Sequence, residues 1–263
     1  QGAAGEAVEV TVSAVEKNEG AARTGSFNLR MEPAGLEPVT ETITVTQNSP
    51  EEMWDLATPV QWNFSADNMG NYKEFFEGLA SDPTAKNALP ADQGPGYISF
   101  SHNYPGLPEE CKRLVGDTGH PYITGAWPGD YWSFRVPVAS LAAGTKIHFT
   151  GLTRTSKTGQ KYWKLVYNDG GEWKPAATLL TKEVNGQTVE YTHAMADDGK
   201  TNIGVDVTVT YSNAITSGNV EFRFICMANA QSSNEAALSA PNGGTSRWAG
   251  AGTADSPRIE VVH

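Results

Sequence analysis

Hydrophobic and polar residues alternate along most of this chain. A period of two is typical of antiparallel strands that bury one face and expose the other to solvent. The apolar positions that alternate in this way are Val8/Val10/Val12, Phe27/Leu29/Met31, Trp132/Phe134/Val136/Val138, Trp163/Leu165/Tyr167, Val205/Val207/Val209/Tyr211 and Val220/Phe222/Phe224. The pattern predicts a protein built mainly of sheets.

Turn-forming residues separate these stretches. Residues 168–171 (Asn-Asp-Gly-Gly) lie between two aromatic-rich stretches and can adopt the positive φ angles of a tight hairpin. Further turns are predicted at residues 185–186 (Asn-Gly) and 197–200 (Asp-Asp-Gly-Lys), and residues 217–219 (Ser-Gly-Asn) precede a strand. The spacing of these turns favours many short strands joined by hairpins.

Helical periodicity is rare. Within residues 71–79, four apolar residues recur at i, i+3, i+4 and i+7, which predicts a two-turn helix. Residues 232–238 are a weaker second candidate. Many strands with few helices predict an all-β protein, a sandwich or jelly roll with one or two short helices.

Composition excludes several classes of protein. Gly (27) and Pro (15) are too frequent for a helical bundle. Lys and Arg number 19 against 30 Asp and Glu, and the net charge of −11 makes nucleic acid and anionic membrane surfaces unfavourable partners. No run of eighteen apolar residues occurs, so this segment is not expected to insert in a membrane. Since Gln1 is not preceded by an initiator Met or an apolar leader, any signal or lipid anchor is expected upstream.

A domain boundary is predicted at residues 47–50 (Gln-Asn-Ser-Pro). The segment before it is rich in Val and Thr, and all seven Trp and both Cys follow it. About 45 residues are too few to bury a core unaided, so the first segment must belong to a larger module or flank the second. We therefore expect one part at residues 1–48 and a second domain at residues 49–263.

The first part resembles the closing half of a BACON domain (Bacteroidetes-associated carbohydrate-binding, often N-terminal). In that family a strand is followed by Asn, then by Arg-Thr-Gly opening the next strand, and the last strand ends in Gln. Here residues 8–12, Asn18, residues 23–27 and residues 42–47 follow this order. The resemblance covers residues 6–47. It implies an immunoglobulin-like segment in a secreted or cell-surface bacterial protein that handles glycans.

The second part resembles the jelly-roll modules that accompany such domains in surface lipoproteins of gut Bacteroidetes. The resemblance lies in residues 129–138, 143–145 and 161–163 and in the final stretch at residues 256–262. It implies a carbohydrate-binding jelly roll over residues 49–263, carried by a secreted protein or an outer-membrane lipoprotein.

Motifs for catalysis are scarce. Residues 117–119 (Asp-Thr-Gly) match the tripeptide of aspartic proteases, which need two copies that share a proton. Only one copy is present, so a turn is the better interpretation. The sequence has no Gly-x-Ser-x-Gly, His-Glu-x-x-His or phosphate-binding loop. The histidines are scattered without metal-ligand spacing: His102, His120, His148, His193 and His263.

The acidic residues leave two alternatives open. A glycosidase needs two facing carboxylates, and the candidates are Asp130 and Glu172, each beside an aromatic residue in the sequence, and Asp255. The same positions suit ordinary hydrogen bonding at strand ends. No cofactor is expected, although a bound structural calcium ion stays open as an alternative. Residues 197–199 lack the alternate-residue spacing of a calcium loop, so no calcium ligand is assigned.

The two cysteines, Cys111 and Cys226, are too far apart for a recognisable disulfide framework or zinc motif. Cys226 is in phase with Val220, Phe222 and Phe224, which predicts a buried thiol. A bridge between the two cysteines is the alternative.

The tryptophans divide into two groups. Trp132 and Trp163 lie on apolar strand faces and are predicted in the core, while Trp127, Trp173 and Trp248 have Gly- or Pro-rich neighbours typical of loops. A loop Trp can plug the end of a sandwich or stack on a sugar ring, and both interpretations stay open. Stacking over roughly 100 Å² gives about 2.5 kcal/mol, whereas millimolar binding needs about 4 kcal/mol, so two aromatic residues and polar partners are required. The candidate ligand-binding residues are Trp127, Asp130, Trp173, Asn242, Arg247 and Trp248.

These observations predict a non-catalytic glycan-binding module whose partner is a polysaccharide or a glycoprotein glycan. The alternatives are a glycoside-active enzyme with a carboxylate pair and a structural spacer or adhesin module without a small ligand.

Overall fold

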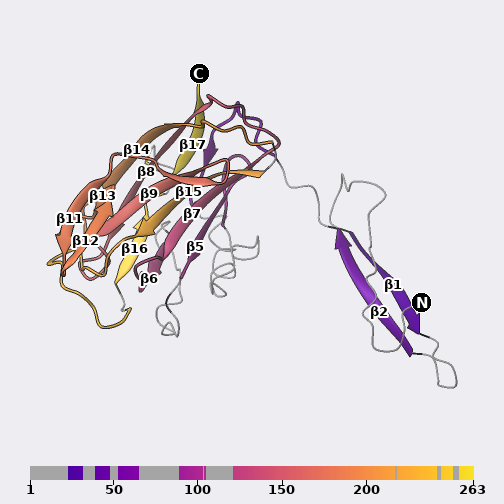
Figure 1. Cartoon of the computed structure of the whole chain (residues 1–263), viewed down its shortest axis with the longest axis horizontal. Helices are drawn as coiled ribbons and strands as arrows, with labels where there is room; N and C mark the ends of the chain where they lie inside the picture. The colour runs from indigo at the N-terminus through magenta and orange to yellow at the C-terminus, as the bar shows by residue number, and fades with distance from the viewer. Residues whose placement is uncertain are drawn as a thin grey trace. The chain divides into compact units, whose positions relative to one another are not determined.

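The computed structural model describes residues 23–31, 39–47, 53–64, 89–102, 104, 121–216, 218–241, 244–250 and 255–263. The chain divides into two compact units, residues 1–52 and residues 53–263. Figure 1 shows both units.

The first unit contains an antiparallel hairpin. Strand β1 (Arg23–Met31) pairs in continuous register with β2 (Val39–Gln47), from Arg23 opposite Gln47 to Met31 opposite Val39. On its exposed side, the Thr42 hydroxyl donates a hydrogen bond to Asn28 Oδ1 at 2.8 Å. The hairpin confirms the two predicted strands that it contains, while the strand predicted at residues 8–12 lies outside the described residues.

The second unit is all-β, as predicted, and its two main sheets are antiparallel throughout. In the seven-stranded sheet the strand order is β10-β9-β15-β7-β5-β4, with β13 also paired to β9. Its strands are β4 (Leu89–Pro90), β5 (Tyr97–Ser101), β7 (Tyr131–Val138), β9 (Tyr162–Asp169), β10 (Glu172–Pro175), β13 (His193–Ala194) and β15 (Gly218–Cys226).

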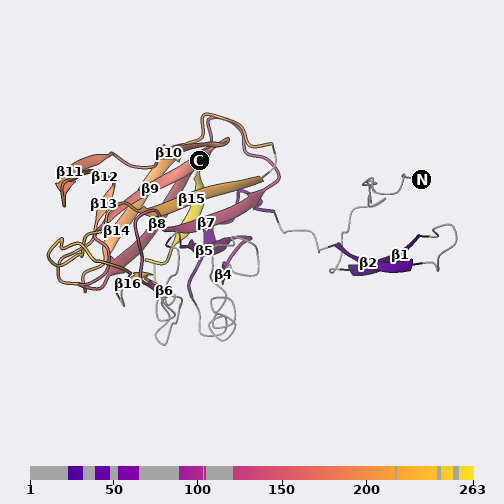
Figure 2. The same ribbon diagram turned by 60° about the horizontal axis from the view of Figure 1, so that its bottom comes forward.

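The other main sheet has six strands in the order β3-β17-β8-β16-β6, with β14 paired to β8. Its strands are β3 (Val60–Gln61), β6 (Tyr122–Thr124), β8 (Lys146–Thr155), β14 (Ile203–Thr210), β16 (Thr245–Trp248) and β17 (Arg258–Val262). A separate hairpin consists of β11 (Leu180–Val184) and β12 (Gln187–Tyr191), as Figure 2 shows beside β9 and β13.

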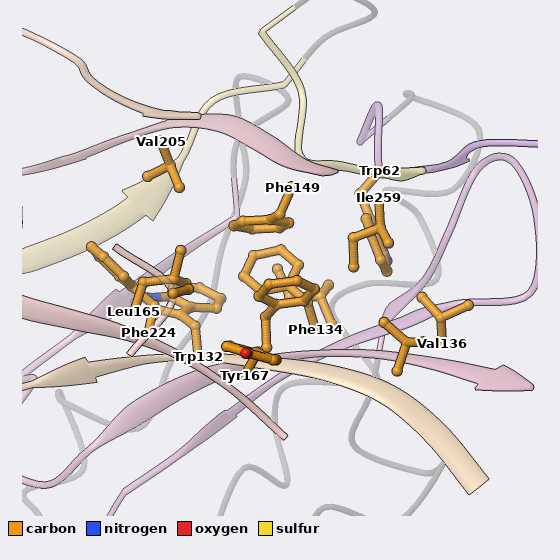
Figure 3. Close-up of a cluster of buried hydrophobic side chains, with 14 of the residues drawn as sticks. Trp62, Trp132, Phe134, Val136, Phe149, Leu165, Tyr167, Val205, Phe224 and Ile259 are labelled. Carbon is orange, nitrogen blue, oxygen red and sulfur yellow. The ribbon is translucent and has the colours of Figure 1, made fainter. Parts of the chain in front are cut away.

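The aromatic core lies between the two main sheets (Figure 3). Phe134 from one sheet and Phe149 from the other have ring centroids 4.9 Å apart, and the Trp163 and Phe224 rings stack at 5.1 Å. The predicted inward phases of β7, β9, β14 and β15 are confirmed, because their alternate apolar residues are buried. Trp132 and Trp163 are core residues, as predicted.

The predicted hairpin turns are present. Gly170 (φ 67°) and Gly171 (φ 104°) join β9 to β10, and Asn185 (φ 50°) and Gly186 (φ 77°) join β11 to β12. Two successive positive φ angles match the right-handed twist of the paired strands.

No helix occurs among the described residues. The helix predicted at residues 232–238 is wrong: this segment forms a turn followed by irregular structure. Two features oppose a helix there. Glu235 has φ +61°, and the Ser232 hydroxyl donates to the carbonyl of Ser156 at 2.8 Å. The helix predicted at residues 71–79 lies outside the described residues.

A second small hydrophobic cluster lies under the β11–β12 hairpin. It comprises Tyr162, Val184, Val189, Ala228 and Ala230. Tyr162 is out of phase with the core residues of β9, so this cluster lies on the side of the seven-stranded sheet that faces away from the main core. The hairpin therefore covers one end of that side.

Cys226 is a free thiol with 1% exposure, which confirms the predicted buried cysteine. Cys111 lies outside the described residues.

Candidate functional site: the outer face of the seven-stranded sheet

The side of the seven-stranded sheet that faces away from the core carries a mixture of aromatic, guanidinium and hydroxyl groups. Strand register defines three rows across it: Tyr97–Arg135–Glu221, Pro175–Val166–Arg223–Ser133–Ser99 and Lys164–Ile225–Tyr131–Ser101. Trp173 lies beside them, opposite Asn168 at the β9–β10 edge. We call these residues the outer face.

Arginine side chains lie over the aromatic rings of the outer face. The guanidinium carbon of Arg223 is 4.1 Å from the Trp173 ring centroid and 4.5 Å from that of Tyr131. The guanidinium carbon of Arg135 is 6.0 Å from the Tyr97 ring centroid. These distances allow cation–π attraction, which restricts the rotamers of both partners.

Glu221 orients the centre of the outer face. Its Oε1 accepts a hydrogen bond from Arg223 Nε at 2.9 Å and another from the Ser133 hydroxyl at 2.9 Å. The carboxylate therefore joins β15 to β7 and holds Arg223 against the rings.

The β9–β10 hairpin supports Trp173. The buried Asp169 carboxylate accepts hydrogen bonds from Lys174 Nζ at 2.6 Å and from the Asn213 backbone at 2.9 Å. Burial alone raises the pKa of Asp169, but these hydrogen bonds and the Lys174 charge outweigh burial and lower it. An ionised Asp169 thus fixes the strand that carries Trp173.

The side chains of the outer face are partly exposed to solvent and pack against one another. Trp173 is 36% exposed, and Tyr97, Tyr131, Arg135 and Arg223 are half-buried against one another. Four strand spacings separate β10 from β5, or about 19 Å at ~4.8 Å each. The face is therefore several sugar rings wide.

The hairpin β11–β12 borders this face. Lys164 Nζ, on β9, lies 3.2 Å from Glu190 Oε2, on β12. The ion pair joins the outer face to the hairpin that covers Tyr162.

The structure separates the residues predicted to form a site. Trp127 is half-buried between β6 and β7, with its ring 5.1 Å from the Tyr104 ring. Asp130 is fully buried and accepts hydrogen bonds from the Trp127 backbone and from His102, each at 2.8 Å. Its carboxylate therefore orders the loop and is too deeply buried to contact a sugar.

Trp248 was predicted in a loop, and this is wrong. It ends β16 and has 0% exposure, with its ring 4.8 Å from Phe134 and 5.4 Å from Phe224. Arg247 precedes it in the six-stranded sheet, not the sheet that bears Trp173. Asn242 lies outside the described residues. Of the six predicted residues, Trp173 is the one that the described structure places on the outer face.

The predicted carboxylates do not form a pair on this face. Asp130 is buried with His102, whereas Glu172 lies 3.4 Å from Lys174 Nζ and Asp255 is exposed near the start of β17. Residues 117–119 and His120 are outside the described residues. Within the described parts of the chain, no group of three or more His, Cys, Asp and Glu side chains could hold a metal ion.

Sequence reasoning missed Tyr97, Tyr131, Arg135, Glu221 and Arg223. The available signal was the polar phase of the alternating strands, in which Tyr131 and Arg135 alternate with Trp132 and Phe134. By itself, that phase predicts only that these side chains face solvent. Strand order was needed to bring these residues together.

No family model matches the sequence, and no curated protein matches it either. The BACON resemblance of residues 6–47 therefore stays a prediction. Among the described residues no helix is long and apolar enough to cross a bilayer.

Several solved structures are similar to this one. They include a CBM4 domain (12% identity, covering 57% of this chain and 84% of that chain, TM-score 0.24). A second is the carbohydrate-binding module CBM36 in complex with calcium and xylotriose (12% identity, covering 63% of this chain and 93% of that chain, TM-score 0.26). A third is the K1 cleaved adhesin domain of Lys-gingipain from Porphyromonas gingivalis (12% identity, covering 93% of this chain and 100% of that chain, TM-score 0.29). TM-scores this low carry no information about ligand or function.

Proposed function

We propose that residues 53–263 form a non-catalytic glycan-binding module of a secreted or surface-anchored bacterial protein, and that the glycan binds on the outer face. The observation that carries the proposal is the grouping of Tyr97, Tyr131 and Trp173 with two arginines on one side of one sheet.

The three rings supply the apolar part of such a site. A sugar ring has an apolar C–H face that can pack on an aromatic ring, at about 2.5 kcal/mol for roughly 100 Å². One ring falls short of the about 4 kcal/mol that millimolar binding needs. Because Trp173 and Tyr97 are four strands apart, an extended oligosaccharide can reach both rings, whereas a single sugar cannot.

Polar side chains between the rings supply directional contacts. The hydroxyls of Ser99 and Ser101 lie on the same face and can exchange hydrogen bonds with sugar hydroxyls. Asn168 can donate from Nδ2, while its Oδ1 accepts a hydrogen bond from the Gly171 backbone at 2.6 Å. Arg135 and Arg223 add N–H donors.

The carboxylate content of the outer face supports binding without cleavage. Glycoside hydrolysis by the usual route needs two carboxyl groups about 5–10 Å apart. Among the outer-face residues, Glu221 is the single carboxylate, and it already accepts hydrogen bonds from Arg223 and Ser133. This arrangement favours a structural role for Glu221 over an acid–base role.

The test is a glycan-array screen of the full chain, followed by calorimetry on the best ligand. Trp173→Ala and Tyr131→Ala should each weaken binding by about 1–3 kcal/mol, as exposed aromatic anchors do, with little change in Tm. Trp127→Ala is the matched control, because Trp127 is a half-buried tryptophan that packs on Tyr104 and is not one of the outer-face residues.

The control also separates the alternatives. If Trp127→Ala abolishes binding while Trp173→Ala leaves it intact, the ligand binds at the β6–β7 loop and the outer-face proposal is wrong. If the array yields no ligand at all, a spacer or adhesin role replaces glycan binding. Release of reducing sugar from a bound glycan would instead establish an enzyme.

A further inference from the structure

Several contacts hold the side chain of Arg223 in place, but they involve only part of its guanidinium group. Its Nε donates to Glu221, and its guanidinium carbon lies over both Trp173 and Tyr131. Within the described part of the chain, its two terminal nitrogens make no hydrogen bond. The side chain is half-buried, so these nitrogens stay within reach of a ligand.

The chemistry of a guanidinium determines what those nitrogens can bind. Each terminal nitrogen carries two N–H donors and no acceptor. Aromatic rings contact a guanidinium on its planar faces, whereas a carboxylate or sulfate accepts two parallel hydrogen bonds at its edge. The contacts that restrain Arg223 therefore leave open the edge that recognises an oxyanion.

The restraint also favours binding. An arginine on an open surface loses rotamer freedom when it captures an anion, which weakens binding. Here two rings and the Glu221 carboxylate already restrict the side chain before a ligand arrives. Arg223 is preorganised as a donor.

We infer that the outer face selects an acidic glycan, and that Arg223 binds a carboxylate or sulfate group of the sugar through its two terminal nitrogens while the neighbouring rings contact the sugar face. This inference depends on the proposed glycan-binding function and adds the chemical class of the ligand.

The experiment compares matched acidic and neutral polymers on the full chain. Polygalacturonate is compared with its fully methyl-esterified form, and dextran sulfate with dextran, by affinity electrophoresis and calorimetry. At least one acidic polymer should bind about tenfold or more tightly than its neutral partner, because charge-assisted hydrogen bonds are the stronger kind. The pair that shows the preference identifies carboxylate or sulfate as the recognised group.

Two variants and one control assign the effect to Arg223. Arg223→Lys keeps the charge but loses the planar pair of donors, and Arg223→Gln loses both; each should remove about tenfold or more of the affinity for the acidic polymer. Arg247→Gln, an arginine on the other sheet, should leave affinity unchanged. Near-UV circular dichroism checks folding, and if Arg223→Gln unfolds, Arg223→Lys decides.

The outcomes separate the two proposals. Equal affinity for acidic and neutral polymers, or full retention of the acidic preference in Arg223→Lys, overturns the selection of acidic glycans and leaves glycan binding intact. Binding to no glycan in the array overturns both. Binding of both acidic polymers that Trp173→Ala leaves unchanged shows nonspecific charge attraction and also overturns the inference.

Discussion

Gly151 on β8 leaves just enough room for the indole of Trp248 on β16. A β-carbon built on Gly151 would lie 3.1 Å from the Trp248 ring and 3.2 Å from the Cα of Pro257. Trp248 has 0% exposure, and its ring also lies 5.8 Å from that of Phe149. The absence of a side chain at one position therefore permits the largest side chain at another.

We expect Gly151→Val to destabilise the protein by about 1–3 kcal/mol, because the added methyl groups overpack the core. Gly204→Val is the control. A β-carbon there has only Leu152 Cδ2 within 4 Å, at 3.9 Å. Denaturant unfolding measures both variants, and equal stabilities would contradict the packing described here.

Trp248→Ala should lower the free energy of unfolding by about 3–5 kcal/mol, as expected for a buried large aromatic residue. Trp173→Ala, at a 36% exposed site, should change stability far less. Urea titration of the two variants gives the comparison. A larger loss of unfolding free energy in Trp173→Ala than in Trp248→Ala would contradict the burial of Trp248 and the exposure of Trp173 described here.

His148 and His193 should titrate in opposite directions. Burial alone lowers the pKa of His148, but hydrogen bonds from its ring to Asp206 at 2.8 Å and Glu260 at 3.2 Å, with the charges of both, outweigh burial and raise it above 6.5. Burial lowers the pKa of His193 to about 4. Two-dimensional NMR of the imidazole protons should resolve one histidine titrating above and one well below pH 6.5.

These shifts have opposite effects on stability. The contribution of His148 is fully present below pH 6.5 and is lost as the pH rises through its raised pKa. The contribution of His193 is present above pH 6.5 and is lost as the pH falls towards 4. His148→Gln should therefore lower stability below pH 6.5, where the contribution of His148 is fully present, and flatten the pH dependence above pH 6.5. An unchanged slope of stability above pH 6.5 would contradict the assignment.

Glu235 should contribute to acid sensitivity. Hydrogen bonds from Lys182 at 2.7 Å, Tyr162 at 2.7 Å and Lys161 at 2.9 Å lower its pKa from 4.5 to about 2. A lowered pKa stabilises the fold above pH 4.5, and this stabilisation is lost as the pH falls towards 2. Thermal unfolding between pH 2 and pH 7 should show a smaller loss of Tm in Glu235→Gln than in wild type, with Glu190→Gln as control.

Cys226 should be unreactive in the folded protein. Its side chain is buried, and burial raises the pKa of the thiol, which suppresses the nucleophilic thiolate. A thiol reagent should modify Cys226 only after denaturant is added, as peptide mapping can show. An intact mass two hydrogens lower, restored by reduction, would instead show a bridge to Cys111.

Local sequence was sufficient for the strands, the turns and much of the core. Trp132, Phe134 and Val136 alternate with polar residues, and alternation reports which side of a strand is buried whatever the neighbouring strand is. The Asn185-Gly186 turn was predictable for a similar reason, because the positive φ angles it requires are a property of those two residues. Residues 232–238 show the limit, since contacts distant in sequence oppose the helix that their composition allows.

Tertiary structure alone decided where a candidate site lies. Trp173 and Arg223 are fifty residues apart, and they meet because β9 pairs on one side with β10 and on the other with β15. Trp248 has a loop-like sequence context but is buried, because Gly151 on a neighbouring strand leaves space for it. Periodicity within one strand determines which way a side chain points, but long-range pairing determines what it meets, and that pairing depends on the whole chain packing around one core.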